Sequence, residues 1–477
     1  MAAEQDVTSS ALWRLTATEL AARFARNAAT PVDYLDVLLA RIERLNPRIN
    51  ALIAFNAQAR TDAQESTARL REGRARGPLE GIPVAIKDNI LVKGMPTTWG
   101  SRAFRDAVSV EDELPVRRLR EAGAVILGKT NVPEFTLEGY TGNLLFGTTR
   151  NPWNVALTPG GSSGGAVAGV AAGLFPLALG TDGGGSIRRP ASHTGLVGLK
   201  PSFGAVPRFP TLPQILLDFE VIGPIARTVE DAALLFSAIA GPDMGDRPGP
   251  ATRVSRVSLD APPPLRILYV RTIDDNALDP EIDASVSVAL QTLVRLGHRV
   301  EVGPLPFDLA AIVEFWPILG QVGLAYVFAQ HPEAEQLAAA RFVEMAQVGR
   351  GIGASRYLGG IETIRLFRHE VAAAFESFDL IMTPSAAALP WPADEFFPAM
   401  IAGRPVGPRG HSVYTGWVNA CGHPAINLPC APASNGLPIG FQLVGRPGDD
   451  ELLFRIAAQY QVAQPFADRW PALAQNG

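Results

Sequence analysis

The sequence predicts an α/β protein, because predicted strands and helices alternate along it and each kind of element has its own residue pattern. A helix around Val116 to Glu121, the strand Ala124 to Leu127 and the polar loop after it form one α/β unit. A strand over 265–270, a helix over 280–296 and a strand after Gly297 form a second unit. The 477 residues and the hydrophobic fraction of 47% suffice for a large buried core.

The N-terminal segment begins with helices whose start signals are visible in the sequence. Thr16 opens a capping box, and Thr30 supplies an N-cap followed by Pro31 at the first helical position. Apolar residues then recur at helical spacing, which predicts an amphipathic helix over 31–45 that ends before Pro47. Next come a short strand over 51–55 and a polar-faced helix over 58–72.

The rest of the chain continues the alternation. Segment 81–89 begins as a buried strand and places Lys87 directly after three apolar residues. Residues 305–360 are mostly helical and apolar, and their pattern does not place them in the fold. Further elements are expected as strands at 196–199, 379–384, 422–429 and 438–445, and as helices at 229–238, 363–378 and 451–461.

Composition excludes several classes of function. A charged fraction of 19% and a net charge of −5 give no basic patch, so we expect no direct nucleic-acid partner. Cys421 and Cys430 form neither a disulfide framework nor a metal cluster, and residues 1–10 lack the pattern of a secretory signal, so a cytoplasmic protein is expected.

Two apolar runs approach or reach the length of a membrane span. The uncharged run 151–181 is long enough, but its glycines and prolines argue against one. The run 315–329 is too short and is interrupted by Pro317, Gly320 and Gly323, so we expect a buried helix or a pocket wall there. No membrane contact is therefore expected.

The stretch 158–190 contains two serine-bearing glycine clusters, at 160–165 and 183–186, with a helix of small residues between them. Glycine loses more backbone freedom on folding than any other residue, so such clusters indicate that backbone N–H groups approach something closely. We therefore expect an active site here.

Two other interpretations of these glycines fit less well. Residues 160–164 match the G-x-S-x-G pattern of a Ser-His-Asp hydrolase, in which the serine lies on a sharp turn directly after a strand, but residues 151–159 are predicted to be a loop. His423 is predicted to be a loop residue rather than the catalytic base of such a hydrolase. No lysine follows either cluster at the spacing of a phosphate-binding loop.

A lysine acting with two serines fits better. Lys87 ends an apolar strand, where desolvation favours its neutral form, and a neutral amine is the general base that a weak serine hydroxyl needs. Keeping it neutral at pH 7 against a reference pKa of ~10.4 requires roughly 4.6 kcal/mol, which burial can supply.

These motifs together resemble the amidase signature family. They occur in the family's order, strongly over about residues 80–205 and weakly towards both ends, with 24 residues from Ser162 to Ser186. The matching segments are 83–88, 128–131, 146–147, 150–153, 160–165, 180–182, 184–188 and 198–201.

The resemblance implies a mixed, twisted central sheet with helices on both sides, and catalysis without a cofactor or metal. It implies that Ser186 is the nucleophile, that Ser162 is a bridging serine after a cis peptide bond, and that Lys87 is the base. The implied oxyanion-hole donors are the backbone N–H groups of Gly183, Gly184, Gly185 and Ser186. The implied supporting residues are Ser163, Asp182 and Arg188.

Two residues depart from the family pattern. Gly183 stands where a larger residue is usual, which would widen the pocket or loosen the oxyanion hole. Arg189 stands where an uncharged residue is commoner, and we expect a solvated charge there rather than a substrate contact.

Family pockets are lined by variable segments, here expected at 138–146, 315–324 and 391–417. Their aromatic residues suggest an apolar or aryl substrate, such as an anilide, aryl amide, carbamate or ester. The expected pocket residues are Phe146, Phe315, Trp316, Trp391, Tyr414 and Trp417.

We therefore expect one continuous body that hydrolyses a small-molecule amide through an acyl-enzyme, as a monomer or homodimer. Its expected parts are an N-terminal helical scaffold (1–75), the catalytic core (76–240), a peripheral lobe shaping the pocket (241–370) and a part that completes the sheet (371–477). Alternatives are the glutaminase subunit of a tRNA-dependent amidotransferase and an inactive binding protein, the latter disfavoured by the intact lysine and serines.

Overall fold

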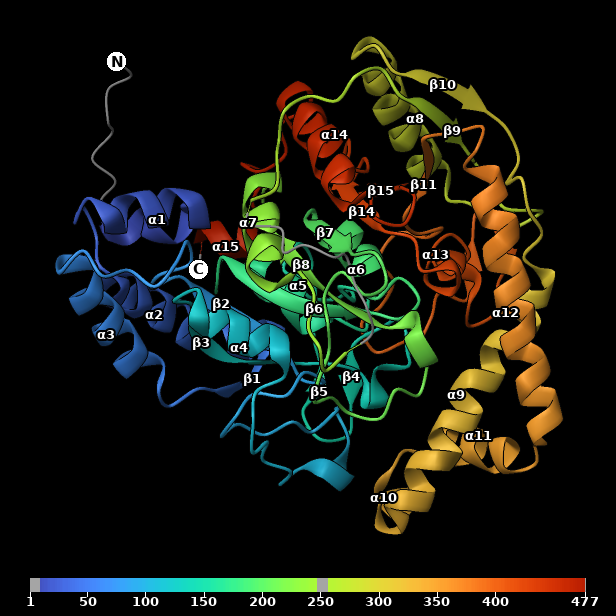
Figure 1. Cartoon of the computed structure of the whole chain (residues 1–477), viewed down its shortest axis with the longest axis horizontal. Coiled ribbons are helices and arrows are strands. Elements are labelled where there is room, and N and C mark those ends of the chain that lie inside the picture. Colours follow the sequence, from blue (N-terminus) through green and yellow to red (C-terminus); the bar gives the residue numbers. More distant parts are fainter. Residues whose placement is uncertain (1–8, 247–255, 477) are drawn as a thin grey trace.

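An eleven-stranded sheet runs through the whole molecule (Figure 1). The computed structural model describes residues 9–246 and 256–476, so residues 1–8, on which the expectation about a signal chiefly depends, lie outside the described part. The strands of this sheet are β1 (Leu52–Phe55), β2 (Pro83–Lys87), β3 (Val125–Thr130), β6 (Leu177–Asp182), β7 (Val197–Lys200), β8 (Val221–Ala226), β9 (Arg266–Tyr269), β10 (Arg299–Val302), β11 (Leu380–Pro384), β14 (Ala425–Pro429) and β15 (Gly440–Val444).

The strand order is β1-β3-β2-β6-β8-β7-β14-β15-β11-β9-β10. Strands β3, β2 and β6 are mutually parallel neighbours, as are β11, β9 and β10, whereas the strands between these two groups pair antiparallel. The predicted mixed α/β sheet is therefore confirmed. Two small hairpins lie outside it: β4 (Gly142–Asn143) with β5 (Gly147–Thr148), and β12 (Met400–Ile401) with β13 (Arg404–Pro405).

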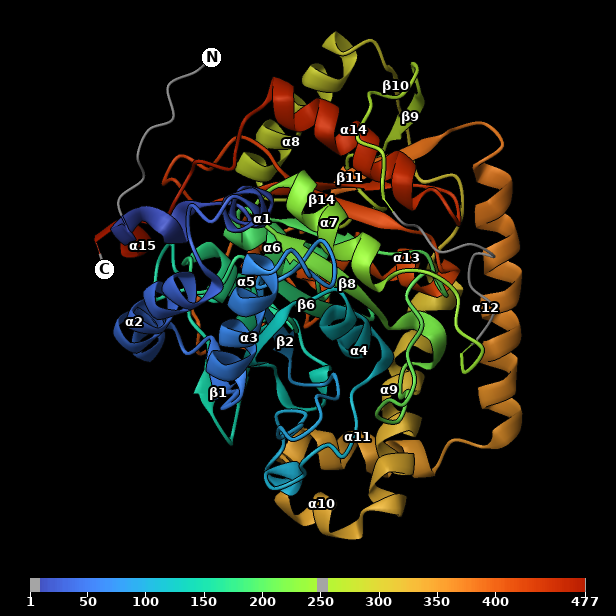
Figure 2. The same ribbon diagram turned by 60° about the vertical axis from the view of Figure 1, so that its left-hand side comes forward.

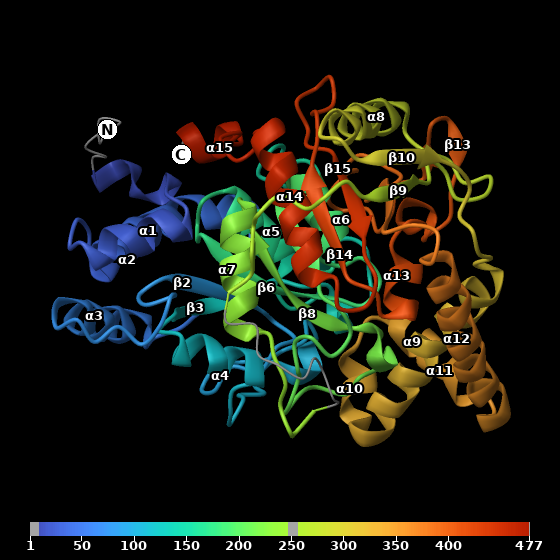
Figure 3. The same cartoon turned by 45° about the horizontal axis from the view of Figure 1, so that its top comes forward.

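Helices cover both faces because successive strand residues point to opposite sides. In β2, Val84 and Ile86 join the core of one face and Ala85 joins the core of the other. The helices on the first face are α1 (Ala17–Ala25), α4 (Leu114–Glu121), α7 (Val229–Ile239), α8 (Pro280–Arg295) and α14 (Asp450–Ala463) (Figure 3). The second face carries α3 (Ala59–Arg71), α5 (Gly164–Ala171), α6 (Arg188–Thr194) and α13 (Gly416–Cys421).

The N-terminal helix α2 (Pro31–Ile49) contributes to the cores of both faces. The capping box at Thr16 and the N-cap at Thr30 are confirmed. The predicted end before Pro47 is wrong, because the proline lies in the last helical turn, and Asn50 ends the helix in a left-handed conformation. Remaining short elements are η1 (Ser9–Arg14), η2 (Arg102–Phe104), η3 (Glu134–Thr136), η4 (Leu217–Phe219), η5 (Gly410–Ser412) and α15 (Ala472–Asn476).

The segment that the sequence does not place forms a helical lobe at one side of the molecule (Figure 2). Its helices are α9 (Ala310–Gln330), α10 (Pro332–Leu337), α11 (Ala340–Arg350) and α12 (Ala354–Ala374). Helix α9 runs without interruption through Pro317 and is the one described helix long and apolar enough to cross a membrane. Half of its most apolar window is buried inside the protein, as in a core helix.

We predict that Leu443→Ala lowers the free energy of unfolding by about 2–5 kcal/mol, because this β15 side chain is fully buried in the core and its loss leaves a cavity. Denaturant unfolding measures the loss. Val462→Ala, at a side chain that is 80% exposed, is the control and should change stability by less than about 0.5 kcal/mol. Equal effects of the two substitutions would contradict the packing described.

Candidate active site

Lys87 is the last residue of β2 and is fully buried. Its Nζ lies 2.8 Å from Ser162 Oγ and 2.7 Å from Thr181 Oγ1, and it donates to the Thr181 carbonyl oxygen at 3.1 Å. Burial lowers the pKa of Lys87 to about 7, although the carboxylates of Glu220 and Asp182 partly oppose the shift. The amine can therefore lose its proton near neutral pH.

A polar layer behind Lys87 fixes its partners. Thr181 Oγ1 lies 3.3 Å from a carboxylate oxygen of Glu220, and Asn89 donates to both of these residues. Arg208 donates to Glu220 at 2.6 Å. Neither Thr181 nor Glu220 was expected from the sequence as a site residue; Thr181 lies inside the matched segment 180–182, whereas no local pattern marks Glu220.

Ser162 follows a cis peptide bond to Gly161, as the resemblance implies. A Cβ at position 161 would lie 2.2 Å from the Tyr140 carbonyl oxygen, so only glycine fits there. Ser163 does not contact Lys87 directly: its hydroxyl donates to the Thr181 carbonyl at 3.1 Å, and its N–H donates to the Ser186 carbonyl at 3.2 Å. Ser163 therefore ties the two glycine clusters together.

Ser186 lies in the loop between β6 and α6, and 8% of its surface is exposed. Its hydroxyl makes no hydrogen bond with any residue in the described part of the chain, and it faces a cavity. The Ser186 hydroxyl is therefore available to a bound molecule.

The amides of the Ser186 loop do not all face the cavity. Gly185 N–H donates to Asp182 Oδ1 at 2.7 Å, so this amide is already used and the expectation that it serves the oxyanion hole is corrected. Gly183, Gly184 and Ser186 line the cavity, and their amides donate to no residue among those described. Gly185 instead has φ of +110° and lies where a Cβ would meet Thr415 Oγ1 at 2.2 Å, so it shapes the loop.

Asp182 and Arg188 form a buried ion pair of 2.9 Å that anchors this loop. Burial alone would raise the pKa of Asp182, but Arg188 and the Asn419 amide outweigh it and hold the pKa well below its ordinary range. Arg188 also donates to Gln442 of β15 at 2.7 Å and to Asn419 of α13 at 2.6 Å. The loop is thus tied to elements more than 200 residues later in the chain.

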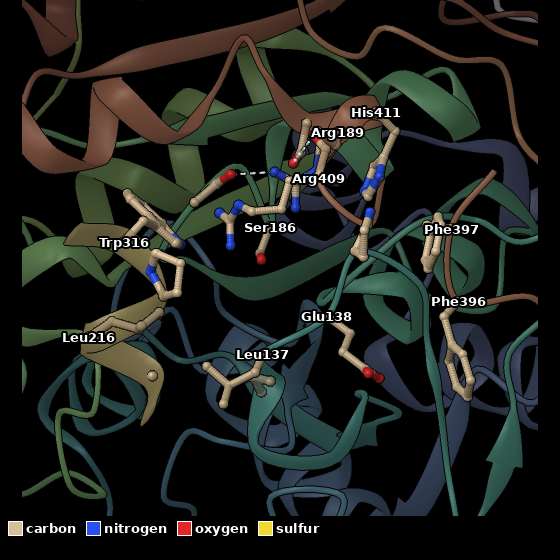
Figure 4. A pocket seen from close by; sticks show the side chains of 18 of the residues that line it. Leu137, Glu138, Ser186, Arg189, Leu216, Trp316, Phe396, Phe397, Arg409 and His411 are labelled. Carbon is tan, nitrogen blue, oxygen red and sulfur yellow. Dashed lines mark hydrogen bonds between the residues drawn. The ribbon is translucent and has the colours of Figure 1, made fainter. Parts of the chain in front are cut away.

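The cavity above Ser186 has a volume of about 190 Å³. Figure 4 shows Trp316 and Leu216 on one side of Ser186 and Phe396 and Phe397 on the other. All three expected segments contribute to the lining. The lining also includes Leu137, Glu138, Arg189, Glu220, Met345, Arg409 and His411.

Among the six aromatic residues expected in the pocket, only Trp316 lines this cavity. Phe315, its neighbour on α9, points into the core against Gly360, because adjacent helical side chains lie about 100° apart. Tyr414 is buried and donates to the Arg271 carbonyl, and Trp391 packs behind His411. Phe146 lies near the β4–β5 hairpin outside the lining, and Trp417 lines a neighbouring cavity instead.

That neighbouring cavity has a volume of about 630 Å³. It shares Trp316, Pro408, Arg409 and Ser412 with the cavity above Ser186, so these four residues separate the two spaces.

The surroundings of Gly183 and Arg189, the two residues that depart from the family pattern, differ from those expected. A Cβ at Gly183 would lie 2.9 Å from Leu216 Cδ1, so Leu216 fills the space and the pocket is not widened there. Arg189 is not a solvated charge: it is 6% exposed, lines the cavity and donates to Thr415 Oγ1 at 2.9 Å and to the Gly184 carbonyl. The reason is a tertiary contact, because Thr415, directly before α13, packs against its guanidinium.

The chain matches known proteins over nearly its whole length. The Amidase family matches residues 33–454. The chain is 35% identical to a glutamyl-tRNA(Gln) amidotransferase subunit from a Picosynechococcus species, covering 93% of this chain and 96% of that one. It is 33% identical to an acylamidase of Rhodococcus erythropolis, covering 98% and 99% of the two chains.

A solved structure gives the same result. A bacterial aryl acylamidase of the amidase signature enzymes aligns with a TM-score of 0.87 at 27% identity, covering 97% of this chain and 99% of that one. The chain therefore belongs to the amidase signature family, as its motifs predict, and it is an amidohydrolase that acts on C–N bonds other than peptide bonds.

We predict that Arg188→Met lowers the free energy of unfolding by about 3–5 kcal/mol, because it leaves the buried Asp182 carboxylate without its counter-ion. Denaturant unfolding followed by circular dichroism measures this. Arg365→Met, at a surface arginine whose side chain is 70% exposed, should cost less than about 1 kcal/mol. A cost for Arg188→Met as small as that of the control would show that the pair does not anchor the loop.

Proposed function

We propose that this amidase hydrolyses small aryl or apolar amides through a Lys87–Ser162–Ser186 relay and an acyl-enzyme. The observation that carries the proposal is the 2.8 Å contact between the buried Lys87 amine and Ser162, beside a cavity into which Ser186 opens. A buried amine that can be neutral near pH 7 is a suitable base for a serine hydroxyl.

The hydrogen bonds around Lys87 support a direction for the proposed proton transfer. A neutral amine keeps two N–H donors, which the carbonyl and hydroxyl oxygens of Thr181 accept. The nitrogen lone pair then faces Ser162, whose hydroxyl donates to it. Ser162 Oγ in turn accepts the proton of Ser186 once that hydroxyl turns towards it, and the bond from Ser163 N–H to the Ser186 carbonyl keeps the two loops together.

The Ser186 oxygen attacks the substrate carbonyl, and a tetrahedral oxyanion forms. The free amides of Gly183, Gly184 and Ser186 are the donors available to it, and one such donor is typically worth about 2.7–4 kcal/mol. Lys87 returns the proton through Ser162 to the leaving amine, which departs. Water then attacks the acyl-enzyme by the same relay and releases the carboxylic acid.

The walls of the cavity favour an apolar or aryl group beside the scissile bond. Leu137, Leu216, Trp316, Met345 and Phe396 supply apolar surface. The bacterial aryl acylamidase and the Rhodococcus acylamidase support amides with such groups as the substrate class. Carbamates and esters present the same kind of carbonyl to the relay, so we include them among the proposed substrates. We also propose a cytoplasmic location.

The similarity to the glutamyl-tRNA(Gln) amidotransferase favours a second function, release of ammonia from glutamine within an assembly. Activity assays on the purified chain distinguish these two functions. Turnover of acetanilides or 4-nitroanilides by the chain alone supports the solitary amidase, whereas strict dependence on glutamine and on partner proteins would support the amidotransferase role.

We predict that Ser186→Ala and Lys87→Ala each reduce kcat on a 4-nitroanilide by at least about 10⁴-fold, because each removes a member of the relay. Release of 4-nitroaniline measures the loss, and circular dichroism checks that the fold persists. Ser377→Ala, at an exposed serine, is the control and should keep full activity. A fluorophosphonate should label Ser186; labelling of another serine would overturn the relay.

We also predict that kcat/KM rises with pH to a plateau, with a midpoint near 7, because only neutral Lys87 can act as the base. Glu220 raises the Lys87 pKa by stabilising the charged amine, so Glu220→Gln should move the midpoint to lower pH. Glu138→Gln, which removes a carboxylate paired with Arg341, should leave the midpoint in place. A profile that is flat from pH 5.5 to 8.5 would rule out Lys87 as the titrating base.

A further inference from the structure

The charged side chains that line the cavity above Ser186 are unequally paired. Glu138 accepts two hydrogen bonds from Arg341, at 2.6 and 2.9 Å. Glu220 pairs with Arg208 at 2.6 Å. Both carboxylates of the lining are thus neutralised by arginines that lie outside it.

Arg189 has no such counter-ion. It is 6% exposed, and within the described part of the chain no carboxylate lies within ion-pair distance of its guanidinium. Its Nη1 donates to Thr415 and Gly184, and its Nε is buried without a partner. The nearby Asp182 carboxylate is occupied by Arg188. A buried cation without an anion is costly, so the site is arranged to receive one.

Arg409 adds a second unpaired guanidinium on the same side of the cavity. It is exposed, lies 4.9 Å from the ring centroid of Trp316 and makes no ion pair with any residue that the structure describes. Figure 4 shows Arg189 and Arg409 beside Ser186, with His411 next to them.

His411 is an independent observation that points to a ligand. It is 3% exposed and lines the cavity, and neither ring nitrogen has a hydrogen-bond partner among the described residues. Burial and the neighbouring cations keep the pKa of His411 well below its ordinary value, so the ring is neutral and carries one N–H donor. Because this ring also lines the cavity, its nitrogens can form a hydrogen bond with a molecule bound there.

We propose that the amide substrate carries a carboxylate, which Arg189, Arg409 and His411 bind beside the scissile carbonyl. This inference rests on the proposed amidase function and narrows its substrate class. Ser186, Arg189, Arg409 and His411 line the same cavity, so the carboxylate and the scissile carbonyl occupy one space, with the carboxylate on either the acyl or the amine side. Arg189 also positions the oxyanion loop through its bond to the Gly184 carbonyl.

Matched substrates test the proposal on the wild-type chain. N-(4-nitrophenyl)succinamic acid carries an acyl-side carboxylate, and its terminal amide is a neutral compound of the same size. 4-Acetamidobenzoate and 4-acetamidobenzamide form the corresponding pair for the amine side. We expect kcat/KM for the acid of one pair to exceed that for its neutral partner by about tenfold or more, as for a charge-assisted contact. The pair in which the acid is the better substrate shows whether the carboxylate lies on the acyl or the amine side of the scissile bond.

Two variants test the residues. Arg409→Gln and Arg189→Gln should each lower the acid-to-neutral ratio of kcat/KM about tenfold. The ratio is compared because Arg189→Gln also removes a hydrogen bond to the Gly184 carbonyl, which would affect both substrates alike. Arg365→Gln removes the same charge at an exposed site and should leave the ratio unchanged. A role of the arginines in loop positioning alone would lower both rates equally and leave the ratio intact, which would overturn the inference.

A binding measurement separates this inference from the proposed function. Calorimetry with the Ser186→Ala variant should show N-(4-nitrophenyl)succinamic acid binding about tenfold tighter than its amide, and Arg409→Gln in that background should remove the difference. Hydrolysis of neutral anilides with no advantage for either acid would overturn the carboxylate inference and leave the amidase function standing. Selective binding of the acid without turnover of any amide would overturn the amidase function and leave the carboxylate site standing.

Discussion

The buried position of Lys87 is the constraint on which the rest of the site depends. An ammonium group placed at the carboxyl end of an apolar strand is desolvated, so its partners must satisfy it both with and without the proton. Thr181 does this from the neighbouring parallel strand β6, offering both its carbonyl and its hydroxyl. The glycines at positions 161 and 165 meet a further constraint: a Cβ at position 161 would clash with the Tyr140 carbonyl, and a Cβ at position 165 would clash with the Asn131 backbone.

The groups proposed to react lie close together in the sequence around β2 and β6, whereas most of the groups proposed to recognise the substrate, Arg189 in α6 excepted, come from later segments. The amine belongs to β2, and the two serines and the free amides belong to the glycine-rich loops. Trp316 belongs to α9, His411 lies in η5 and Arg409 lies directly before η5. The Asp182–Arg188 pair ties the Ser186 loop to α13 through Asn419 and to β15 through Gln442. The sheet therefore holds the chemistry, and the later segments shape the substrate cavity without entering the proposed relay.

The sequence predicted the local features well. Capping residues, strand patterns and the order of the glycine motifs are short-range signals, and they located the helix starts, the mixed sheet and the segments that meet beside Lys87. Features set by tertiary contacts were missed. Arg189 was expected in solvent because its cover, Thr415, lies 226 residues further on. Phe315 and Trp316 could not be told apart without the rotation of α9, and the use of Gly185 N–H by Asp182 depends on the shape of one loop. Glu220 has no sequence signal at all.

The position of the last strands has a consequence for how the molecule is made. Strands β14 and β15 lie in the middle of the sheet, between β7 on one side and β11 on the other, although they are the last to be synthesised. Until they emerge from the ribosome, the two halves of the sheet expose unpaired edges, and Arg188 lacks its β15 partner. The loop that carries Ser186 thus acquires this support only after β15 has been synthesised. Pairing between strands that are distant in sequence is generally associated with slow folding, and here it leaves these edges unpaired until β14 and β15 are available.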